Sequence, residues 1–251
     1  MKILTKKLSF TKKGRMATIL GAILMSSSAF AQVTISQTQS FNFTPNGSQS
    51  LTFNKINGNV SDFNDILDIT ISIVFTKTGG SLSVDNDSAE SGEVTFTHTL
   101  AGALNQGSGP ALIDSGFSTG WAAVNAISST TQFLEATTGD PTDEFNNTGL
   151  GDFYRFDPDP VTVASSSSIA SAVWGQYFEA TGPGTFSWNF SANQLTDATG
   201  LGGLQQALTV SQAQGTVTVE YSLIPEPGTI VLATIMFGSL GGLHLLKRRK
   251  K

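Results

Sequence analysis

Alternation of apolar and polar residues at a period of two runs through the middle of this 251-residue chain. It is clearest in four segments, at 69–75, 94–100, 186–190 and 217–223. Successive side chains of a strand point to opposite faces, so the pattern indicates strands with one buried and one solvated face. Weaker segments of the same kind lie at 33–43, 50–56, 81–84, 161–164, 173–178 and 207–211. Many short strands without a sustained helical period predict an all-β domain, an antiparallel β-sandwich or jelly roll.

Gly, Asn, Asp and Ser separate the expected strands, as in the turn at Asn57-Gly58. We expect the Ser-rich run 165–168 to be a loop inside the domain. The stretches Trp121 to Thr137 and Leu201 to Gln206 are each expected to form a helical turn or two. Once the two ends are set aside, roughly 190 residues remain, enough to bury one complete core.

Charge is placed unevenly along the chain. Six of the 14 Lys and Arg fall in the first 15 residues and five in the last five, which leaves Lys55, Lys77 and Arg155 between them. From 32 to 224 these three bases face 18 of the 19 Asp and Glu, a net charge of −15 against −5 for the whole chain. Phosphate binding needs a basic face, so this middle argues against a nucleic-acid partner and favours low-affinity Ca²⁺ or Mg²⁺. The chain has no cysteine, which excludes disulfides and thiolate metal sites.

The N-terminus has the three-part order of a secretory signal peptide. A basic stretch is followed by the apolar run Ala17 to Met25, which is too short to span a bilayer. Small residues then lead to Ala29 and Ala31 in the small-x-small arrangement that signal peptidase cleaves. We therefore assign residues 1–31 as a signal peptide, which predicts an exported protein and places the β domain at 32–224.

The C-terminus combines a proline-flanked acid, an apolar helix and a basic tail. Residues 228–246 carry no formal charge, and as a helix they would be roughly 28 Å long, just enough to cross the hydrocarbon core. By the positive-inside rule, the five terminal cations keep the tail in the cytoplasm and the β domain outside. These cations are Lys247, Arg248, Arg249, Lys250 and Lys251.

Before this helix stand Pro225, Glu226 and Pro227, which hold an extended, protease-accessible spacer. The whole segment, 225–251, resembles the PEP-CTERM sorting signal of Gram-negative-type bacteria. The resemblance implies recognition by an exosortase, a membrane protease and transpeptidase that removes the helix. The precursor would then be anchored transiently in the inner membrane, and the mature form would reach the cell surface or an exopolysaccharide matrix. A plain tail anchor is the alternative.

The middle of the chain is similar to the choice-of-anchor E ectodomains, a family of bacterial β domains joined to different C-terminal anchors. The residues that carry the similarity are Leu51 to Phe53 with Phe63, Ile66 to Phe75, Leu82 to Val84, Gly182 to Phe186, and Gly215 to Tyr221. The resemblance implies a β topology and a surface location. It implies no activity and no catalytic residue.

Residues able to do chemistry are few. His98 is in phase with Phe96 and Leu100, which predicts a partly buried structural histidine. With no second histidine in the β domain and no cysteine, a zinc site or a catalytic triad has no partners to assemble from. Turn carboxylates offer hard oxygen ligands, so Asp85 with Asp87, and Asp157 with Asp159, are candidate Ca²⁺ ligands.

Four functional hypotheses follow. The first is a non-catalytic exported surface or matrix protein that needs no cofactor and is processed by an exosortase-like enzyme. The second is a carbohydrate-binding or adhesive module of the exopolysaccharide matrix, which needs exposed aromatic side chains on one face or in a cleft. A secreted glycoside hydrolase needs two facing carboxylates, and an ice-binding protein needs several threonine rows like Thr95, Thr97 and Thr99 in register.

Overall fold

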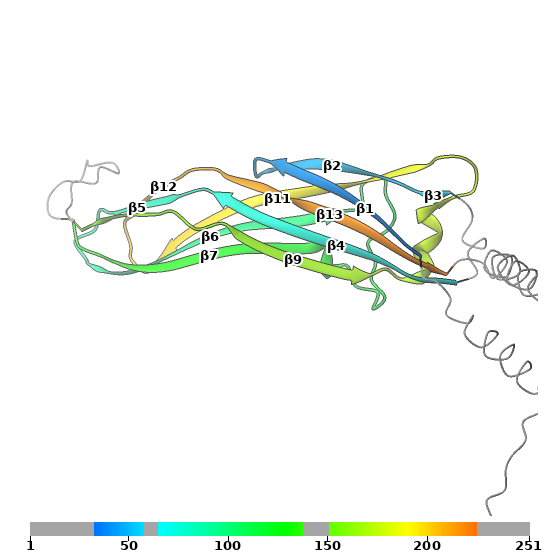
Figure 1. The fold of residues 1–251 in the computed structure, drawn as a ribbon. Helices are drawn as coiled ribbons and strands as arrows, with labels where there is room; N and C mark the ends of the chain where they lie inside the picture. Colours follow the sequence, from blue (N-terminus) through cyan, green and yellow to red (C-terminus); the bar gives the residue numbers. More distant parts are fainter. Residues whose placement is uncertain (1–32, 58–64, 138–150, 225–251) are drawn as a thin grey trace, which may run out of the picture. The chain divides into compact units, whose positions relative to one another are not determined.

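The computed structural model describes residues 33–57, 65–137 and 151–224. The chain divides into two compact units. One unit, made of residues 34–62 and 68–221, carries a β-sandwich (Figure 1). The other unit consists of 1–33, 63–67 and 222–251, and only the outer ends of three strands are described in it.

Two four-stranded sheets face each other, and a three-stranded sheet and a short pair complete the β structure. Sheet I contains, in spatial order, β1 (Val33–Phe43), β13 (Ser211–Ile224), β4 (Asp65–Gly79) and β9 (Val161–Ser168). Sheet II contains β2 (Gly47–Asn54), β11 (Thr185–Thr199), β6 (Gly92–Asn105) and β7 (Ala123–Leu134). Sheet III contains β12 (Leu204–Leu208), β5 (Leu82–Asn86) and β8 (Phe153–Phe156). The parallel pair is β3 (Ile56–Asn57) with β10 (Phe178–Glu179).

The order of the strands is that of a jelly roll. Numbered in chain order, the eight long strands lie as 1-8-3-6 in sheet I and 2-7-4-5 in sheet II. Sheet III continues sheet I, because β5 follows β4 and β13 follows β12 in the chain while the spatial order is kept. The interruption between β4 and β5 is at Gly79 and Gly80, whose positive φ angles of 63° and 80° suit glycine. The prediction of an antiparallel all-β sandwich is confirmed.

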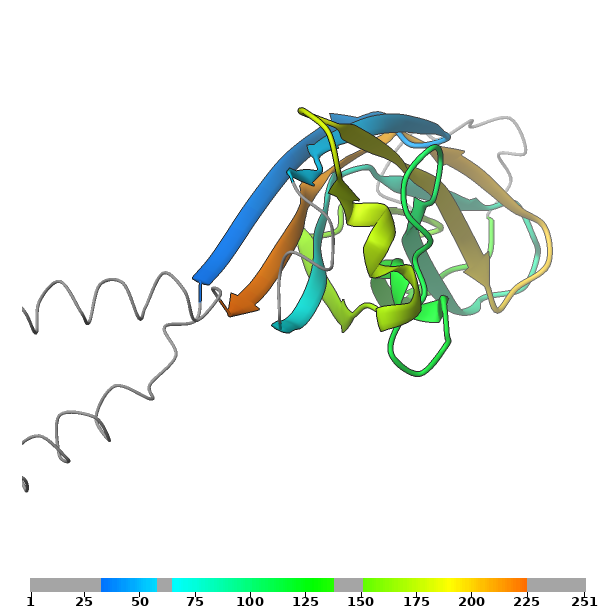
Figure 2. The ribbon, with the colours of Figure 1, turned by 90° about the vertical axis from the view of Figure 1, so that its right-hand side faces the viewer.

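The core lies between the inward faces of the sheets, which Figure 2 shows as two layers. Alternate residues of β4 and β6 are fully buried, as the period-two pattern predicts. Phe41 stacks on Phe190 with ring centroids 4.1 Å apart, and Phe75 packs against both. A second apolar cluster fills the space between sheet III and sheet II. It contains Leu82, Val84, Val94, Phe96, Leu134 and Ala198.

Three local expectations were wrong, and one, a helical turn or two in Trp121 to Thr137, holds only for the first turn. Trp121 to Thr137 forms a single 3₁₀ turn, η3 (Gly120–Ala122), and then β7, which pairs with β6 along its whole length. Leu201 to Gln206 makes a bend and the start of β12. The segment 173–178, expected to be a strand, lies mostly in the 3₁₀ helix η4 (Ser171–Tyr177). The serines at 165–168 are not a loop but belong to β9, because cross-strand pairing with β4 supplies the backbone hydrogen bonds that local propensity does not.

The addressing segments lie outside the described residues. These are the signal peptide 1–31 with Ala29 and Ala31, the Pro225–Pro227 motif, the helix expected at 228–246 and the basic tail. Within 33–57, 65–137 and 151–224, none of the helices has the length and hydrophobicity needed to span a bilayer.

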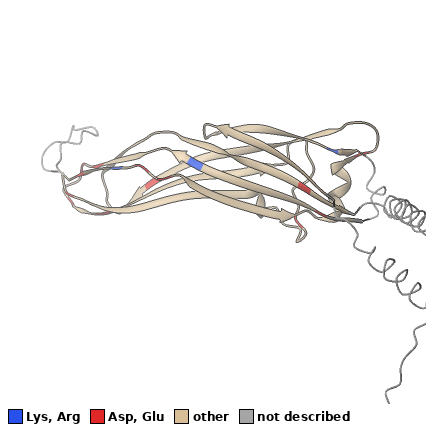
Figure 3. Cartoon of the chain, viewed as in Figure 1, with Lys and Arg blue, Asp and Glu red and all other residues tan. Residues whose placement is uncertain are grey.

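The outward faces of the sheets carry few charges (Figure 3). Hydroxyl side chains on neighbouring strands bond one another there instead. Thr52 bonds Ser187 at 2.9 Å, Thr76 bonds Thr162 at 2.8 Å and Thr38 bonds Thr218 at 2.9 Å. Most of the acidic surplus therefore belongs to turns and strand ends, and the strand faces carry few charges.

Candidate functional site

The most unusual chemistry in the described part of the chain is a buried set of polar side chains between the sheets. Lys77 comes from β4, His98 from β6 and Ser211 from β13, and all three have no exposed surface. Ser128 of β7 and Gln194 of β11 complete the set, which we call the polar cluster. It lies where β4 ends, next to the break at Gly80.

Lys77 makes as many hydrogen bonds as an ammonium group has N–H bonds. Its Nζ lies 2.7 Å from Ser128 Oγ, 3.1 Å from the His98 carbonyl oxygen and 3.2 Å from His98 Nδ1. An ammonium has three donors and no acceptor, so these three acceptors satisfy it. Neither of the two ion pairs in the described ranges involves Lys77. The buried cation is therefore held by neutral acceptors.

These bonds fix the direction of the remaining ones. Because His98 Nδ1 accepts from the ammonium, the neutral imidazole carries its proton on Nε2 and donates it to Ser211 Oγ at 3.2 Å. Ser211 Oγ donates to Gln194 Oε1 at 3.1 Å, and the same oxygen accepts the Ser211 N–H at 2.9 Å. Gln194 Nε2 then donates to the carbonyl oxygen of Thr209 at 3.0 Å. Each group in this chain therefore donates a hydrogen bond to the next one, from Lys77 on β4 to Thr209 in the segment before β13.

Burial shifts both titratable groups of the polar cluster toward their neutral forms. Desolvation lowers the pKa of Lys77 from 10.5 to about 8. Desolvation, and then the Lys77 charge, lower the pKa of His98 from 6.5 to about 4, while the bond at its own carbonyl acts in the opposite direction. Near pH 7 Lys77 is therefore mainly an ammonium and His98 a neutral imidazole, as the hydrogen-bond directions require.

The order Ser211, His98, Lys77 has the connectivity of a nucleophile, a base and an orienting group. In a working triad, however, Nε2 of the histidine accepts the serine proton. Here Nε2 donates, and the serine proton is used by Gln194. None of the three side chains reaches solvent. We therefore interpret the polar cluster as a structural link between the sheets.

Gly80 is part of the same arrangement. Its φ is +80°, and a Cβ there would lie 2.7 Å from both His98 Nε2 and Ser211 Oγ. Distances this short do not occur for real Cβ atoms, so any side chain at this position would displace the polar cluster. The break in the sheet and the polar cluster therefore depend on one another.

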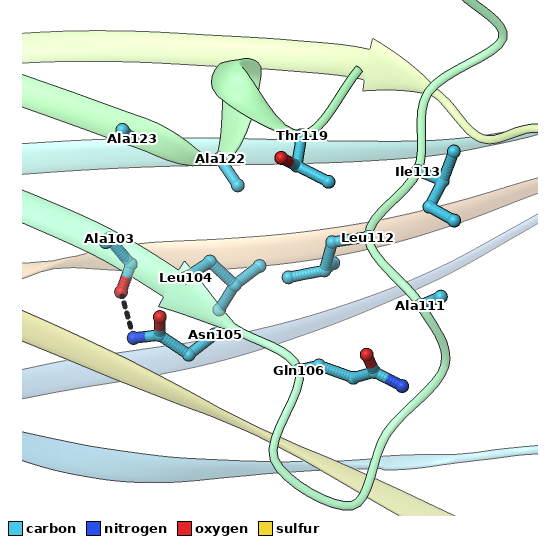
Figure 4. Close-up of a pocket in the computed structure, with 10 residues that line it drawn as sticks. All are labelled: Ala103, Leu104, Asn105, Gln106, Ala111, Leu112, Ile113, Thr119, Ala122 and Ala123. Atoms are coloured by element: carbon cyan, nitrogen blue, oxygen red, sulfur yellow. Dashed lines mark hydrogen bonds between the residues drawn. The ribbon is translucent and has the colours of Figure 1, made fainter. Parts of the chain in front are cut away.

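A second candidate site is an open cavity of about 410 Å³ at the end of β6 (Figure 4). Leu104 and Leu112 form part of its apolar lining, while Asn105, Gln106 and Thr119 add polar groups. Asn105 Nδ2 is already engaged with Ser191 Oγ at 2.9 Å. None of the described residues that line the cavity carries a carboxylate or an imidazole. It suits a small neutral ligand rather than acid–base chemistry.

The loop 106–119 forms one wall of the cavity, and hydrogen bonds to β11 and η4 hold it in place. Trp188 Nε1 donates to the Pro110 carbonyl at 3.0 Å, and the Ala111 N–H donates to Gln176 Oε1 at 3.1 Å. Asp114 Oδ1 accepts two backbone N–H groups of the same loop. Phe117, at the loop tip, is 78% exposed and has a φ of +62°, a rare conformation for a bulky residue.

The structure does not bring the two candidate Ca²⁺ pairs together. Asp85 lies within β5, opposite Phe153, whereas Asp157 follows β8 and pairs with Arg155 at 2.9 Å. Four residues of strand, about 13 Å, separate their levels in sheet III. Asp85 is buried, and Asp87 and Asp159 lie in the turns beyond the strands. No group of three or more metal-binding side chains occurs within the described ranges.

His98 is on the inward face, as predicted, and is fully rather than partly buried. Lys77, Ser211 and Gln194 were not predicted from the sequence. One signal was available, because Lys77 continues the apolar series of β4 through Ile73 and Phe75 in phase and is therefore an inward-facing lysine. Its acceptors come from β6 and β7, which no local pattern connects to β4.

The fold and the two candidate sites define a jelly-roll sandwich with a buried polar link and a neutral cavity. No protein-family model matches this sequence, and no curated protein matches it either. Among solved structures, one described as Desmodium yellow mottle tymovirus is 6% identical, with 78% of this chain and 92% of that chain covered and a TM-score of 0.13. Infectious bursal disease virus, Gt strain, is 15% identical, with 81% and 44% covered and a TM-score of 0.11. Scores this low carry no argument about function.

Proposed function

We propose that this chain is a non-catalytic, exported protein of the bacterial surface or extracellular matrix. The observation that carries the proposal is the order of its segments. A signal-peptide pattern at 1–31 precedes the β domain, and Pro225–Pro227, an uncharged stretch and five cations follow it. In this proposal an exosortase-like enzyme removes the inner-membrane helix 228–246 and passes the sandwich outward.

Two properties of the sandwich support this assignment. Its stability needs no disulfide, because the sequence has no cysteine and the buried side chains of the sheets form the core. Its outward faces carry few charges, while the domain as a whole has a large negative charge. Like charge keeps such a domain dispersed and hydrated, which suits a position within a polysaccharide matrix.

The test is the intact mass and location of the mature protein in its own cells, compared with a Glu226→Ala variant. We expect the native protein to begin at Gln32, to end near Pro225–Pro227 and to leave the inner membrane. The variant should keep its helix and stay there. Glu220→Ala is the matched control, since Glu220 is an exposed acid of β13 just before the motif. If both proteins retained Lys251 in the inner membrane, the chain would be a plain tail-anchored protein.

One observation favours the carbohydrate-binding alternative. Phe117 combines high exposure with a positive φ, on the loop that lines the cavity, and strain of this kind often marks ligand sites. An exposed ring can stack on a sugar. Phe117→Ala should then weaken binding to the cells' own exopolysaccharide, while Phe133→Ala, at a ring on β7 that is 53% exposed, should not. Equal binding by both variants would count against this alternative.

The ice-binding alternative has less support. Thr95 does lie between Thr131 and Thr199 on the outward face of sheet II. The adjacent rows, however, place Asp197 beside Thr97 and Leu195 beside Thr99. A carboxylate and a leucine interrupt the flat threonine array that the alternative requires.

A further inference from the structure

Glutamine side chains close one seam between the edges of sheets I and II. Gln37 donates from Nε2 to the Asn54 carbonyl and accepts the Asn54 N–H at Oε1, both at 2.8 Å. Gln49 makes a similar pair of bonds across the hairpin to two residues of β1. Its Oε1 accepts the Asn42 N–H at 3.1 Å, and its Nε2 donates to the Ser40 carbonyl at 3.4 Å. Each amide takes the place of a peptide group of a missing strand. The edges of β1 and β2 are thereby protected from pairing with other chains.

The edge strand β12 has no such protection. It pairs with β5 on one side, and no described strand pairs with its other side. Its sequence, Leu204-Gln205-Gln206-Ala207-Leu208, contains neither a charge nor a proline. Leu208 is 57% exposed, and Val210, two residues further along the chain, is also exposed. Leu195 of β11 is exposed as well. The opposite edge strand, β8, carries the Arg155–Asp157 ion pair followed by Pro158.

The register shows which backbone groups of β12 face outward. Thr209 N–H donates to the Ser81 carbonyl, so the odd-numbered residues of this segment point toward β5. On the other side of β5, the Asn86 N–H donates to the Asp152 carbonyl. The backbone N–H and C=O groups of the even-numbered residues of β5 therefore point toward β8. The N–H and C=O groups of Leu204, Gln206 and Leu208 therefore point to the open edge.

We propose that this edge pairs with the same edge of a second copy of the chain, antiparallel, about a two-fold axis at Gln206. The sequence of β12 is nearly symmetric about this residue. Leu204 then faces Leu208 of the second copy, and Gln206 faces Gln206. Each facing pair exchanges two backbone hydrogen bonds, and two three-stranded sheets join into one. The exposed Leu208 of each copy becomes covered, one at each end of the contact.

A second copy fits this edge better than an unrelated strand, because only self-pairing uses the symmetry of the sequence. The contact is small compared with a standard interface of roughly 1,600 Å², so the dimer forms in a concentration-dependent way. Each ectodomain carries a net charge of −15, and the two repel one another. Added salt should therefore strengthen the dimer until this repulsion is screened. The inference does not depend on how the protein is exported.

The first test uses the absence of cysteine in the full-length chain. In cells, Gln206→Cys should give a covalent dimer on mild oxidation or with a short thiol-to-thiol cross-linker, because Cα atoms of a facing pair lie about 5.5 Å apart. Gln205→Cys is the matched control, since it faces Ala207 of the second copy. Val74→Cys, at an exposed position on β4, controls for random collision. Equal cross-linking of all three variants would overturn the proposal, and so would its absence in all.

The second test uses charge. Purified mature protein should show a mass that rises with concentration in light scattering. Gln206→Lys and Gln206→Glu should each remain monomeric, because each places like charges opposite one another at the axis. Mixing the two variants should restore the dimer. A native protein that stays monomeric, or a mixture that stays monomeric, would refute pairing at Gln206.

Discussion

Lys77 is expected to make the stability of the sandwich rise with pH in the mildly alkaline range. The pKa of this amine is 10.5 in an unfolded chain and about 8 in the fold, because burial disfavours the ammonium. Between these values the unfolded state holds a proton that the folded state has released. Stability increases with pH wherever the unfolded state binds more protons. The contribution of Lys77 is therefore least favourable below pH 8 and improves as the pH rises above it.

The magnitude follows from the size of the shift. One pKa unit corresponds to 1.36 kcal/mol, so a shift from 10.5 to about 8 gives about 3 kcal/mol when the titration is complete. Two buried tyrosines limit the useful range. Burial raises the pKa of Tyr177 and of Tyr221 far above 10.0, so above that pH the unfolded chain loses phenolic protons that the fold retains. That effect lowers stability, which leaves a window from pH 8 to 10 and about 2 kcal/mol within it.

The assay is urea unfolding followed by tryptophan fluorescence, at pH 7.5, 8, 9 and 10, on the native protein and on Lys77→Met. The native midpoint should rise by roughly 1 M urea across the series, given an m-value of about 2 kcal/mol/M. Lys77→Met should show no rise, because the titrating amine is gone. Lys55→Met is the matched control and should keep the rise, since Lys55 is not fully buried and pairs with Glu179. Identical slopes for the native protein and Lys77→Met would refute the reasoning.

Three further outcomes are expected. The free energy of unfolding should fall by about 3 kcal/mol as the pH drops from 6.5 toward 4, because His98 is protonated in the unfolded chain before it is protonated in the fold. In His98→Gln the urea midpoint should fall much less over the same pH range. Gly80→Ala should cost about 2 to 4 kcal/mol in urea unfolding, while Gly182→Ala, at φ +78° with open space around it, should cost about 1 kcal/mol. Gln37→Ala should cost about 1 to 2 kcal/mol and raise hydrogen exchange at Asn54, whereas Gln132→Ala, at an exposed β7 position, should change neither.

Much of the fold could be predicted because the period of the apolar residues is a local property. The alternation through Ile69, Ile71 and Ile73 defines a strand and its inward face without reference to any other segment. The order of the strands is not local. The partners of β4 are β13 and β9, which lie far from it in the chain. β7 was missed for the same reason, since Ser128 to Thr131 forms a strand only because β6 pairs with it.

The candidate sites were less accessible to sequence reasoning. His98 could be assigned to the inward face, but its role depends on Lys77 and Ser211, which arrive from sheet I. The carboxylates proposed as Ca²⁺ ligands form two separate pairs, Asp85 with Asp87 and Asp157 with Asp159, whose members are close together in the chain. Closeness in the chain does not by itself assemble a site: Asp85 belongs to β5, Asp157 pairs with Arg155, and no group of three or more metal-binding side chains occurs within the described ranges.

The polar cluster does more to specify the alignment of the sheets than to stabilise them. Burying an ammonium carries a desolvation cost. The three hydrogen bonds of Lys77 to neutral acceptors offset this cost only in part, as its lowered pKa indicates. A slip of β4 by two residues would keep its apolar side chains on the inner face but would move Lys77 away from its acceptors on His98 and Ser128. In such a slip isoleucine and phenylalanine would meet other apolar side chains and lose much less, because apolar contacts are not directional. The cluster therefore penalises wrong registers at the point where sheet I breaks at Gly80 and where the alignment would otherwise be least constrained.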